Sequence, residues 1–326
     1  MDSKRVLVTG GAGFIGSYLV ESLLNSGHEV VVFDDFSYGS AENLSLVKNH
    51  QALKVIHGDI RDLKSLQSAA KDVDELFHLA VLNLRLALED PCLASEVNVR
   101  GTVNICRVAQ KNRSIKKIVF TSTGAVYGRA KYLPKDEKHP LGAISPYAAD
   151  KVAGEMYIQA FYECFNTPYT ILRVFNTYGP RSQEAEYAEV IPIFVERVTK
   201  GLPPVIFGTG KQRMDFTYVT DIVDGIVSAA ESDRIQNDIV NLASGQDSSI
   251  NELANLVLKL LDKEDEIKPI YVPPRPHERL VHTEPSTPIV SISKIQRLID
   301  YRPKVAFEDG LQKYIEWYCR RKRIQL

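Results

Sequence analysis

A short glycine-rich segment near the start of the chain constrains the fold more than any other feature. Arg5–Thr9 is a β-branched, apolar run that predicts a buried strand, and residues 10–16 follow it with four glycines. Apolar side chains then recur at helical spacing as far as about Ser26, and Gly27 is the expected C-terminal stop. Glu29–Asp34 predicts a second strand that ends in an acid. This order of strand, glycine turn, helix, strand and acid is that of a dinucleotide-binding unit.

The residue types in this unit fit a dinucleotide. Gly10, Gly13 and Gly16 permit a tight turn and the close approach of a pyrophosphate, whose charge the helix N-terminus stabilises. Their spacing is Gly-x-x-Gly-x-x-Gly, whereas other dinucleotide folds have Gly-x-Gly-x-x-Gly. Asp34 can accept hydrogen bonds from the adenosine ribose hydroxyls and would repel a 2′-phosphate. The unit therefore predicts NAD rather than NADP as the cofactor.

The alternation of strands and helices continues through the first half of the chain. Leu53–His57, residues 75–80 and residues 117–122 are expected strands, and Asp90-Pro91 opens a long helix that ends at about Lys111. Strands that alternate with helices predict a parallel, doubly wound α/β sheet. Ligands of such sheets bind at the C-terminal ends of the strands.

Polar and small residues fall at those strand ends. Asp59 follows the third expected strand and could accept from an adenine amino group, while Ile60 could cover the ring. Leu79 and Ala80 end the fourth strand, where they would face the cofactor. Residues 121–128 leave the fifth strand with several hydroxyl groups, including Thr123, although a plain polar turn would have the same composition.

A second helix start carries a tyrosine and a lysine. Ser145 is a good N-cap and Pro146 fits the first helical position, so a helix is expected to begin there. Tyr147 and Lys151 are four residues apart and share one face of that helix. A phenol beside a lysine at a positive helix end favours its deprotonated form. An ordinary surface pair on an amphipathic helix has the same spacing, so the other motifs must decide.

Composition excludes several classes of partner. The chain has 326 residues and a formal net charge of -1, which indicates neither nucleic-acid binding nor binding to an acidic membrane. No apolar run reaches the length of a membrane span, and no signal peptide leads the chain. The four cysteines are far apart and show no metal-binding spacing, so we expect free thiols, no metal and a cytoplasmic location.

These segments together resemble the extended short-chain dehydrogenase/reductase family, in particular its nucleotide-sugar 4-epimerases of the UDP-glucose type and its dehydratases. The resemblance covers nearly the whole chain. It rests on residues 10–16, 58–60, 78–80 and 172–181, together with Asp34, Asn98, Thr123, Tyr147 and Lys151. Several independent motifs in the right order are far more specific than any one of them.

The resemblance implies a Rossmann domain with a doubly wound parallel sheet and a smaller C-terminal α/β domain. NAD is expected on residues 1–175, to which the chain returns at about residues 215–242, and the substrate on residues 176–326. It also implies a homodimer that pairs the helices starting at Pro91 and Tyr147. Apolar residues at helical spacing, such as Val152 and Met156, fit that use and fit core packing nearly as well.

The resemblance assigns roles to single residues. The expected cofactor contacts are Gly10, Gly13, Phe14, Ile15, Gly16, Asp34, Asp59, Ile60, Leu79, Ala80, Asn98, Tyr147, Lys151 and Phe175. The expected contacts of a nucleotide-sugar substrate are Thr123, Asn176, Phe207, Arg213, Arg275 and Glu278. Arg213 stands one residue before the arginine of the family pattern. Such a shift on a strand turns the side chain to the other face unless the loop bulges.

The resemblance also narrows the reaction. Tyr147, with Lys151 and Thr123 as catalytic partners, would take a proton from a sugar hydroxyl while hydride leaves the same carbon for NAD⁺. Dehydratases and decarboxylases of the family carry acids where this chain has Gly124 and Ala125. The expected activity is therefore 4-epimerisation of a UDP-hexose through a 4-keto sugar. A dehydratase or reductase of the same family and a non-catalytic dinucleotide-binding protein are the alternatives, and the sugar itself stays open.

Overall fold

The computed structural model describes residues 3–182, 189–273 and 289–324. Its main sheet has seven parallel strands in the order β10-β6-β5-β4-β1-β2-β3. They are β1 (Arg5–Thr9), β2 (Glu29–Asp34), β3 (Leu53–His57), β4 (Glu75–His78), β5 (Lys117–Thr123), β6 (Tyr169–Val174) and β10 (Asp238–Leu242). The parallel, doubly wound sheet expected from the sequence is confirmed.

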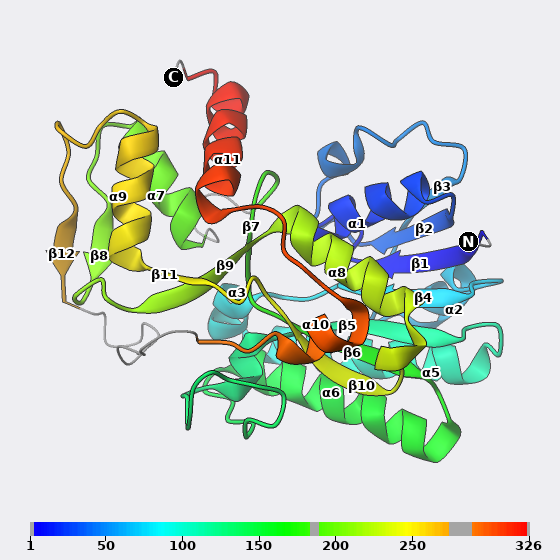
Figure 1. The fold of residues 1–326 in the computed structure, drawn as a ribbon. Helices are drawn as coiled ribbons and strands as arrows, with labels where there is room; N and C mark the ends of the chain where they lie inside the picture. The colour runs from blue at the N-terminus through cyan, green and yellow to red at the C-terminus, as the bar shows by residue number, and fades with distance from the viewer. Residues whose placement is uncertain (1–2, 183–188, 274–288, 325–326) are drawn as a thin grey trace.

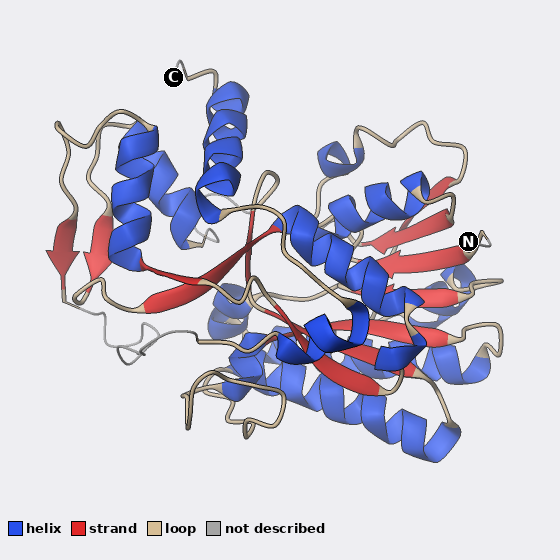
Figure 2. Ribbon diagram, in the orientation of Figure 1, coloured by secondary structure: helices blue, strands red, loops and turns tan. Residues whose placement is uncertain are grey.

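Helices cover both faces of this sheet (Figure 2). They are α1 (Phe14–Asn25), α2 (Leu63–Ala69), α5 (Gly101–Lys111), α6 (Pro146–Phe165), α8 (Val219–Glu231) and α10 (Ser293–Ile299). The strands alternate their side chains between two cores: Val6 and Val8 pack with α1 and α8, whereas Leu7 packs with α2 and α5. Both faces are apolar because both are covered, as in other parallel sheets.

The long helix expected from Pro91 to Lys111 is present, with one irregularity. It begins as α4 (Pro91–Ser95), passes through a π-helical turn (Glu96–Arg100) and continues as α5. A short helix, α3 (Leu84–Glu89), precedes it with Asn83 as its N-cap. Such π turns are rare and often mark functional sites. The turn contains Asn98, and its contacts are described below.

A smaller α/β part lies beside the main sheet, at the left of Figure 1. Its helices and strands are β7 (Asn176–Tyr178), α7 (Val190–Thr199), β8 (Val205–Phe207), β9 (Arg213–Tyr218), β11 (Asp247–Ser249), α9 (Ile250–Leu260), β12 (Ile270–Val272) and α11 (Phe307–Lys322). Phe194, Leu253 and Tyr314 belong to its separate core. The Ser249 hydroxyl accepts from the Glu252 N–H and the Glu252 carboxylate accepts from the Ser249 N–H, so α9 begins with a capping box.

The chain crosses between the two parts more than once. After β6 it enters the smaller part, and it returns to the main sheet as α8 and β10, while β9 stays in a three-stranded sheet with β7 and β11. The chain returns to the main sheet once more near α10. There Val290, Ile292 and Ile295 pack in the same core as β1. The expected division after residue 175 stays a prediction, because nothing tests it directly.

Two further observations concern the described part of the chain. None of the helices in residues 3–182, 189–273 and 289–324 is both long and apolar enough to cross a membrane. The same residues contain no group of three or more His, Cys, Asp and Glu that could hold a metal ion. Short 3-10 helices complete the described elements, at Ala41–Leu44, Gly124–Tyr127 and Asp233–Ile235.

Candidate active site

A cavity of about 1430 Å³ opens at the C-terminal ends of the strands. Pockets for single small ligands are typically about 300–1,000 Å³, so this one has room for two. Most of the predicted site residues line it: Gly10, Gly13, Phe14, Ile15, Gly16, Asp34, Asp59, Ile60, Leu79, Ala80, Thr123, Tyr147, Lys151, Phe175, Asn176 and Arg213. We call the part lined by residues 10–16, 34–43 and 58–60 the glycine half. The part lined by Thr123, Tyr147, Lys151 and residues 174–178 is the tyrosine half.

The glycine turn is too crowded for side chains. Gly10 has a φ of +72°, and a Cβ on it would lie 2.6 Å from the Ala80 backbone nitrogen. A Cβ on Gly16 would overlap the Gly10 carbonyl oxygen. Gly13 is the N-cap of α1 and offers no side-chain acceptor, so the N–H groups of the first turn have no side-chain cap. This cradle fits the pyrophosphate of a dinucleotide.

Asp34 is fixed by backbone groups on both sides. Its Oδ2 accepts from the Ala12 N–H and its Oδ1 from the Phe36 N–H, each at 2.9 Å. Burial raises the pKa of Asp34 above its usual value, although these N–H groups oppose the change. The carboxylate therefore faces the cavity in one orientation, as the recognition of ribose hydroxyls requires.

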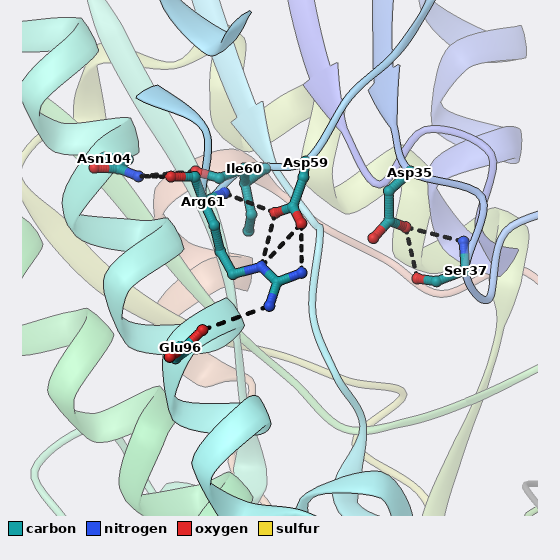
Figure 3. Close-up of polar contacts among 7 residues, drawn as sticks. All are labelled: Asp35, Ser37, Asp59, Ile60, Arg61, Glu96 and Asn104. Atoms are coloured by element: carbon teal, nitrogen blue, oxygen red, sulfur yellow. Dashed lines mark hydrogen bonds and ion pairs between the residues drawn. The ribbon is translucent and has the colours of Figure 1, made fainter. Parts of the chain in front are cut away.

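Asp59 and Ile60 line the glycine half, and Figure 3 shows the polar contacts that hold them. Arg61 binds the Asp59 carboxylate through Nε at 2.9 Å and through Nη2 at 2.5 Å. Partial burial would raise the pKa of Asp59, but the hydrogen bonds and charge of Arg61 hold it below its usual value. The Ile60 carbonyl accepts from Asn104 Nδ2 at 3.0 Å. Both residues are thus held before any ligand binds.

Helix α6 carries the tyrosine and the lysine, as expected. The Ser145 hydroxyl accepts from the Ala148 N–H at 3.2 Å, and Pro146 occupies the first turn. Lys151 is buried with Nζ 4.2 Å from the centroid of the Phe120 ring. Burial lowers the pKa of Lys151 to about 7, while the charges of Glu155 and Asp150 oppose the change. At neutral pH, without a ligand, Lys151 is therefore only partly protonated.

Thr123 ends β5 at the mouth of the tyrosine half. Its Oγ1 accepts from the Ala125 N–H at 3.2 Å, which leaves the hydroxyl hydrogen to donate. The next residue, Gly124, lies under the Phe175 ring, and a Cβ there would be 2.6 Å from a ring carbon. Among the described lining residues the carboxylates are Asp34, Asp35, Asp59 and Glu189. None of these acids lies on the segments that carry Thr123 and Tyr147.

A buried ion pair supports this half from beneath. Glu155 lies one turn after Lys151 on α6, and Arg173 on β6 binds it through Nη2 at 2.7 Å and Nε at 3.0 Å. The Ser122 hydroxyl donates to the same carboxylate at 2.5 Å. The group joins α6 to β5 and β6. The pattern of the sequence gave no sign of it, since the partners lie on three separate segments.

Two predicted contacts do not reach the cavity. Asn98 is buried behind it, where Oδ1 accepts from the Leu82 N–H at 2.8 Å and Nδ2 donates to the Leu82 carbonyl at 3.0 Å. Leu82 lines the cavity, so Asn98 holds the backbone of a lining residue, and its role toward the cofactor stays a prediction. Phe207 ends β8 and is not among the described lining residues. Arg275 and Glu278 lie outside the residues that the structure describes.

Arg213 lines the cavity but has partners of its own. Its Nε lies 2.5 Å from Asp247 Oδ2, and its Nη1 lies 3.3 Å from Glu252 Oε2. Asn176 Nδ2 donates to the Asp215 carbonyl at 2.9 Å. Whether either side chain binds a substrate stays a prediction.

Sequence reasoning missed one wall of the cavity. Lys135 and Ile289 both line it, and the Lys135 N–H donates to the Ile289 carbonyl at 3.1 Å. Asn241 Nδ2 donates to the Lys135 carbonyl at 3.2 Å and so ties this crossing to β10. No local pattern could have predicted a contact between two loops so far apart in the sequence.

The comparisons agree with this geometry. Residues 6–243 match the model of the NAD dependent epimerase/dehydratase family. A putative UDP-glucose 4-epimerase from Methanocaldococcus jannaschii is 36% identical and aligns over 96% of this chain and 97% of its own length. A UDP-N-acetyl-alpha-D-glucosaminuronate decarboxylase from Bacillus cytotoxicus is 33% identical over 97% of this chain and 98% of its own.

Solved structures show the same relationship. The UDP-N-acetylglucosamine 4-epimerase from Methanobrevibacter ruminantium, in complex with UDP-N-acetylmuramic acid, superposes with a TM-score of 0.89 at 34% identity. It covers 98% of this chain and 100% of its own. With the glycine cradle, the tyrosine helix and these alignments taken together, the chain belongs to the NAD dependent epimerase/dehydratase family.

Proposed function

We propose that this chain is an NAD-dependent nucleotide-sugar 4-epimerase that acts on a UDP-hexose. One observation carries the proposal: Tyr147, Lys151 and Thr123 line one half of a cavity whose other half fits a dinucleotide. Among the described lining residues, none of the carboxylates comes from the segments that carry Thr123, Tyr147 and Lys151. A reaction at that point has a phenol, an amine and a hydroxyl for proton transfer and hydrogen bonding.

The glycine half holds the cofactor. Its glycine cradle and the N-terminus of α1 receive the pyrophosphate, Asp34 binds the adenosine ribose and Asp59 accepts from adenine. When bound, NAD⁺ supplies a centre that accepts a hydride from the sugar and later returns it. Lys151 lines the same cavity and would hold the nicotinamide ribose.

The residues of the tyrosine half handle the proton. Tyr147 takes the proton of the sugar 4-hydroxyl as that carbon is oxidised, and Thr123 donates a hydrogen bond to the same oxygen. Lys151 favours the deprotonated phenol for as long as it carries its charge. Tyr147 gives the proton back when the 4-keto sugar is reduced on its other face, so no net oxidation occurs.

Dehydration and decarboxylation need acidic groups that the segments around Thr123 and Tyr147 do not present among the described lining residues. Elimination of water from a keto sugar needs an acid and a base at the neighbouring carbons. Gly124 and Ala125 stand beside Thr123, and the Phe175 ring fills the space above Gly124. Because the family contains decarboxylases and dehydratases as well, this local packing favours the epimerase over them.

Direct product analysis tests the proposal. The purified protein is incubated without added NAD with UDP-glucose, UDP-N-acetylglucosamine or UDP-glucuronate, and the products are resolved by NMR. We expect the 4-epimer of one of them to form, with no keto sugar accumulating. A released keto, deoxy or decarboxylated sugar with no epimer would contradict it and would favour a dehydratase or decarboxylase.

We also infer that the chain forms a homodimer through α4 and α6. Leu93 on α4 is 38% exposed, and Met156 and Tyr157 on α6 are 47% and 43% exposed, so a paired surface would bury apolar groups that otherwise face water. Sedimentation should give twice the monomer mass, and Met156→Glu should shift it toward the monomer. A monomer at micromolar concentration would contradict the inference. A cytoplasmic location stays a prediction from the sequence.

A further inference from the structure

The Asp59 carboxylate is held by a single neighbouring residue. Its carboxylate receives three N–H groups from Arg61: the backbone N–H at 2.8 Å, Nε at 2.9 Å and Nη2 at 2.5 Å. Two carboxylate oxygens offer about four lone-pair directions in all. The fork of Arg61 therefore leaves about one acceptor position, and only a hydrogen-bond donor can fill it (Figure 3).

Arg61 reaches this carboxylate from behind. Asp59 lines the cavity, whereas Arg61 is not among the described lining residues. The other end of its guanidinium lies 3.5 Å from Glu96, the first residue of the π-helical turn (Figure 3). Arg61 is thus anchored on a separate element, and the hydrogen bonds that the Asp59 carboxylate receives within the described chain all come from it.

The neighbouring residue fixes where a base can lie. Ile60 is buried, and a Cβ on Gly101 would lie 2.4 Å from its Cδ1, so the side chain fits tightly against α5. Its carbonyl is held by Asn104. A purine that rests on Ile60 therefore meets a surface whose position is fixed before binding.

We propose that Arg61 is a positioning residue that fixes Asp59 as an acceptor-only carboxylate, so that the site selects a cofactor with a 6-amino purine over one with a 6-oxo purine. This rests on the proposed cofactor site. Adenine presents an amino donor at the 6-position. Hypoxanthine presents an oxygen at the 6-position and carries its donor at N1, one ring position away. Because Asp59 and Ile60 are fixed, this donor would not be aligned with the acceptor position that remains on Asp59.

The test compares two dinucleotides by binding alone. After removal of copurifying cofactor, NAD⁺ and nicotinamide hypoxanthine dinucleotide are titrated by calorimetry into the wild type, Arg61→Ala, Arg61→Lys and Arg100→Ala. Arg100 is the matched control, because its charge also lowers the pKa of Asp59 but it gives Asp59 no hydrogen bond in the described structure.

We expect the wild type and Arg100→Ala to prefer NAD⁺ about tenfold or more, as sites built around one hydrogen bond do. Arg61→Ala should bring the preference to within about threefold, mainly by weakening NAD⁺. Arg61→Lys should lie between, because an ammonium cannot form the fork.

Several results would overturn the proposal. They are equal binding of both dinucleotides by the wild type, a full preference in Arg61→Ala, and an equal loss of affinity for both dinucleotides in that variant. An effect of Arg100→Ala as large as that of Arg61→Ala would also overturn it, since charge alone would then explain the selection. No turnover is measured, so failure of the epimerase proposal leaves these outcomes readable.

Discussion

The two halves of the cavity hold their polar groups in different ways. In the glycine half, Asp34 and Asp59 already accept hydrogen bonds from Ala12, Phe36 and Arg61. In the tyrosine half, Lys151 is buried against an aromatic ring and its pKa is lowered by that burial. The first arrangement suits recognition, because fixed acceptors select their donors. The second suits reaction, because a desolvated group changes its proton state with small changes in its surroundings.

The largest effect should come from the group that we assign to proton transfer. Tyr147→Phe is expected to slow epimerisation about 10³-fold or more while NAD⁺ binding is kept, because general acid–base groups contribute about 10²–10⁴. Steady-state rates with the active nucleotide sugar check this. Tyr271→Phe, at an exposed position on β12 outside the described cavity lining, is the control and should keep the wild-type rate. If Tyr147→Phe kept most of its turnover, Tyr147 would not be the proton-transfer group. The tyrosine half would then serve recognition, as the glycine half does.

Removing the ion pair beneath that half should lower the stability of the fold. Glu155→Gln leaves the buried Arg173 without its counter-charge, and the free energy of unfolding should fall by about 3–5 kcal/mol. Urea denaturation measures it. Glu196→Gln removes the partner of an exposed lysine on α7 and should cost less than about 1 kcal/mol. Equal effects of the two substitutions would mean that packing, not the ion pair, holds α6.

The proton state of Lys151 gives a prediction about pH. The folded chain holds a Lys151 pKa of about 7, and an unfolded lysine has about 10.4. Between these values the unfolded state binds more protons, so this group adds stability as the pH rises, and its burial cost is fully present below about pH 7. Near pH 6, the melting temperature of ligand-free Lys151→Met should therefore be higher than that of the wild type. This difference in melting temperature, the gap, should narrow toward pH 9. A gap that is constant over this range would refute the prediction.

The smallest effect is expected at the edge of the tyrosine half. Arg213 is already paired with Asp247 and Glu252, so Arg213→Ala should change the KM for the nucleotide sugar less than about threefold. Steady-state kinetics with Asp247→Asn as a second variant check this. A rise in KM of tenfold or more at unchanged kcat would instead show direct binding of the substrate.

The glycine half could be predicted from the sequence because the residues that form it lie close together along the chain. Gly10, Gly16 and Asp34 lie within one strand–helix–strand unit, and their spacing alone predicts the turn and the acid. The parallel sheet followed from the same kind of local alternation. Ser145 likewise predicted the start of α6, which the structure confirms.

The tyrosine half depends on contacts between distant segments. Glu155 on α6 pairs with Arg173 on β6, Arg213 pairs with Asp247, and the Lys135 N–H donates to the Ile289 carbonyl across nearly half of the chain. Asn98 shows the same limit: the family resemblance implied a cofactor contact, and no local pattern predicted that its side chain binds the Leu82 backbone from the π turn. One sequence holds no local pattern for such pairings, since each depends on the completed fold.

The position of β10 has a consequence for how the protein is made. This strand forms one edge of the main sheet and pairs with β6. Three strands of the smaller part, β7, β8 and β9, are translated between β6 and β10. During synthesis β6 emerges as an open edge that can pair with other chains. The main sheet is incomplete until residues 238–242 have been synthesised. Until then, the nascent chain must keep the edge of β6 covered.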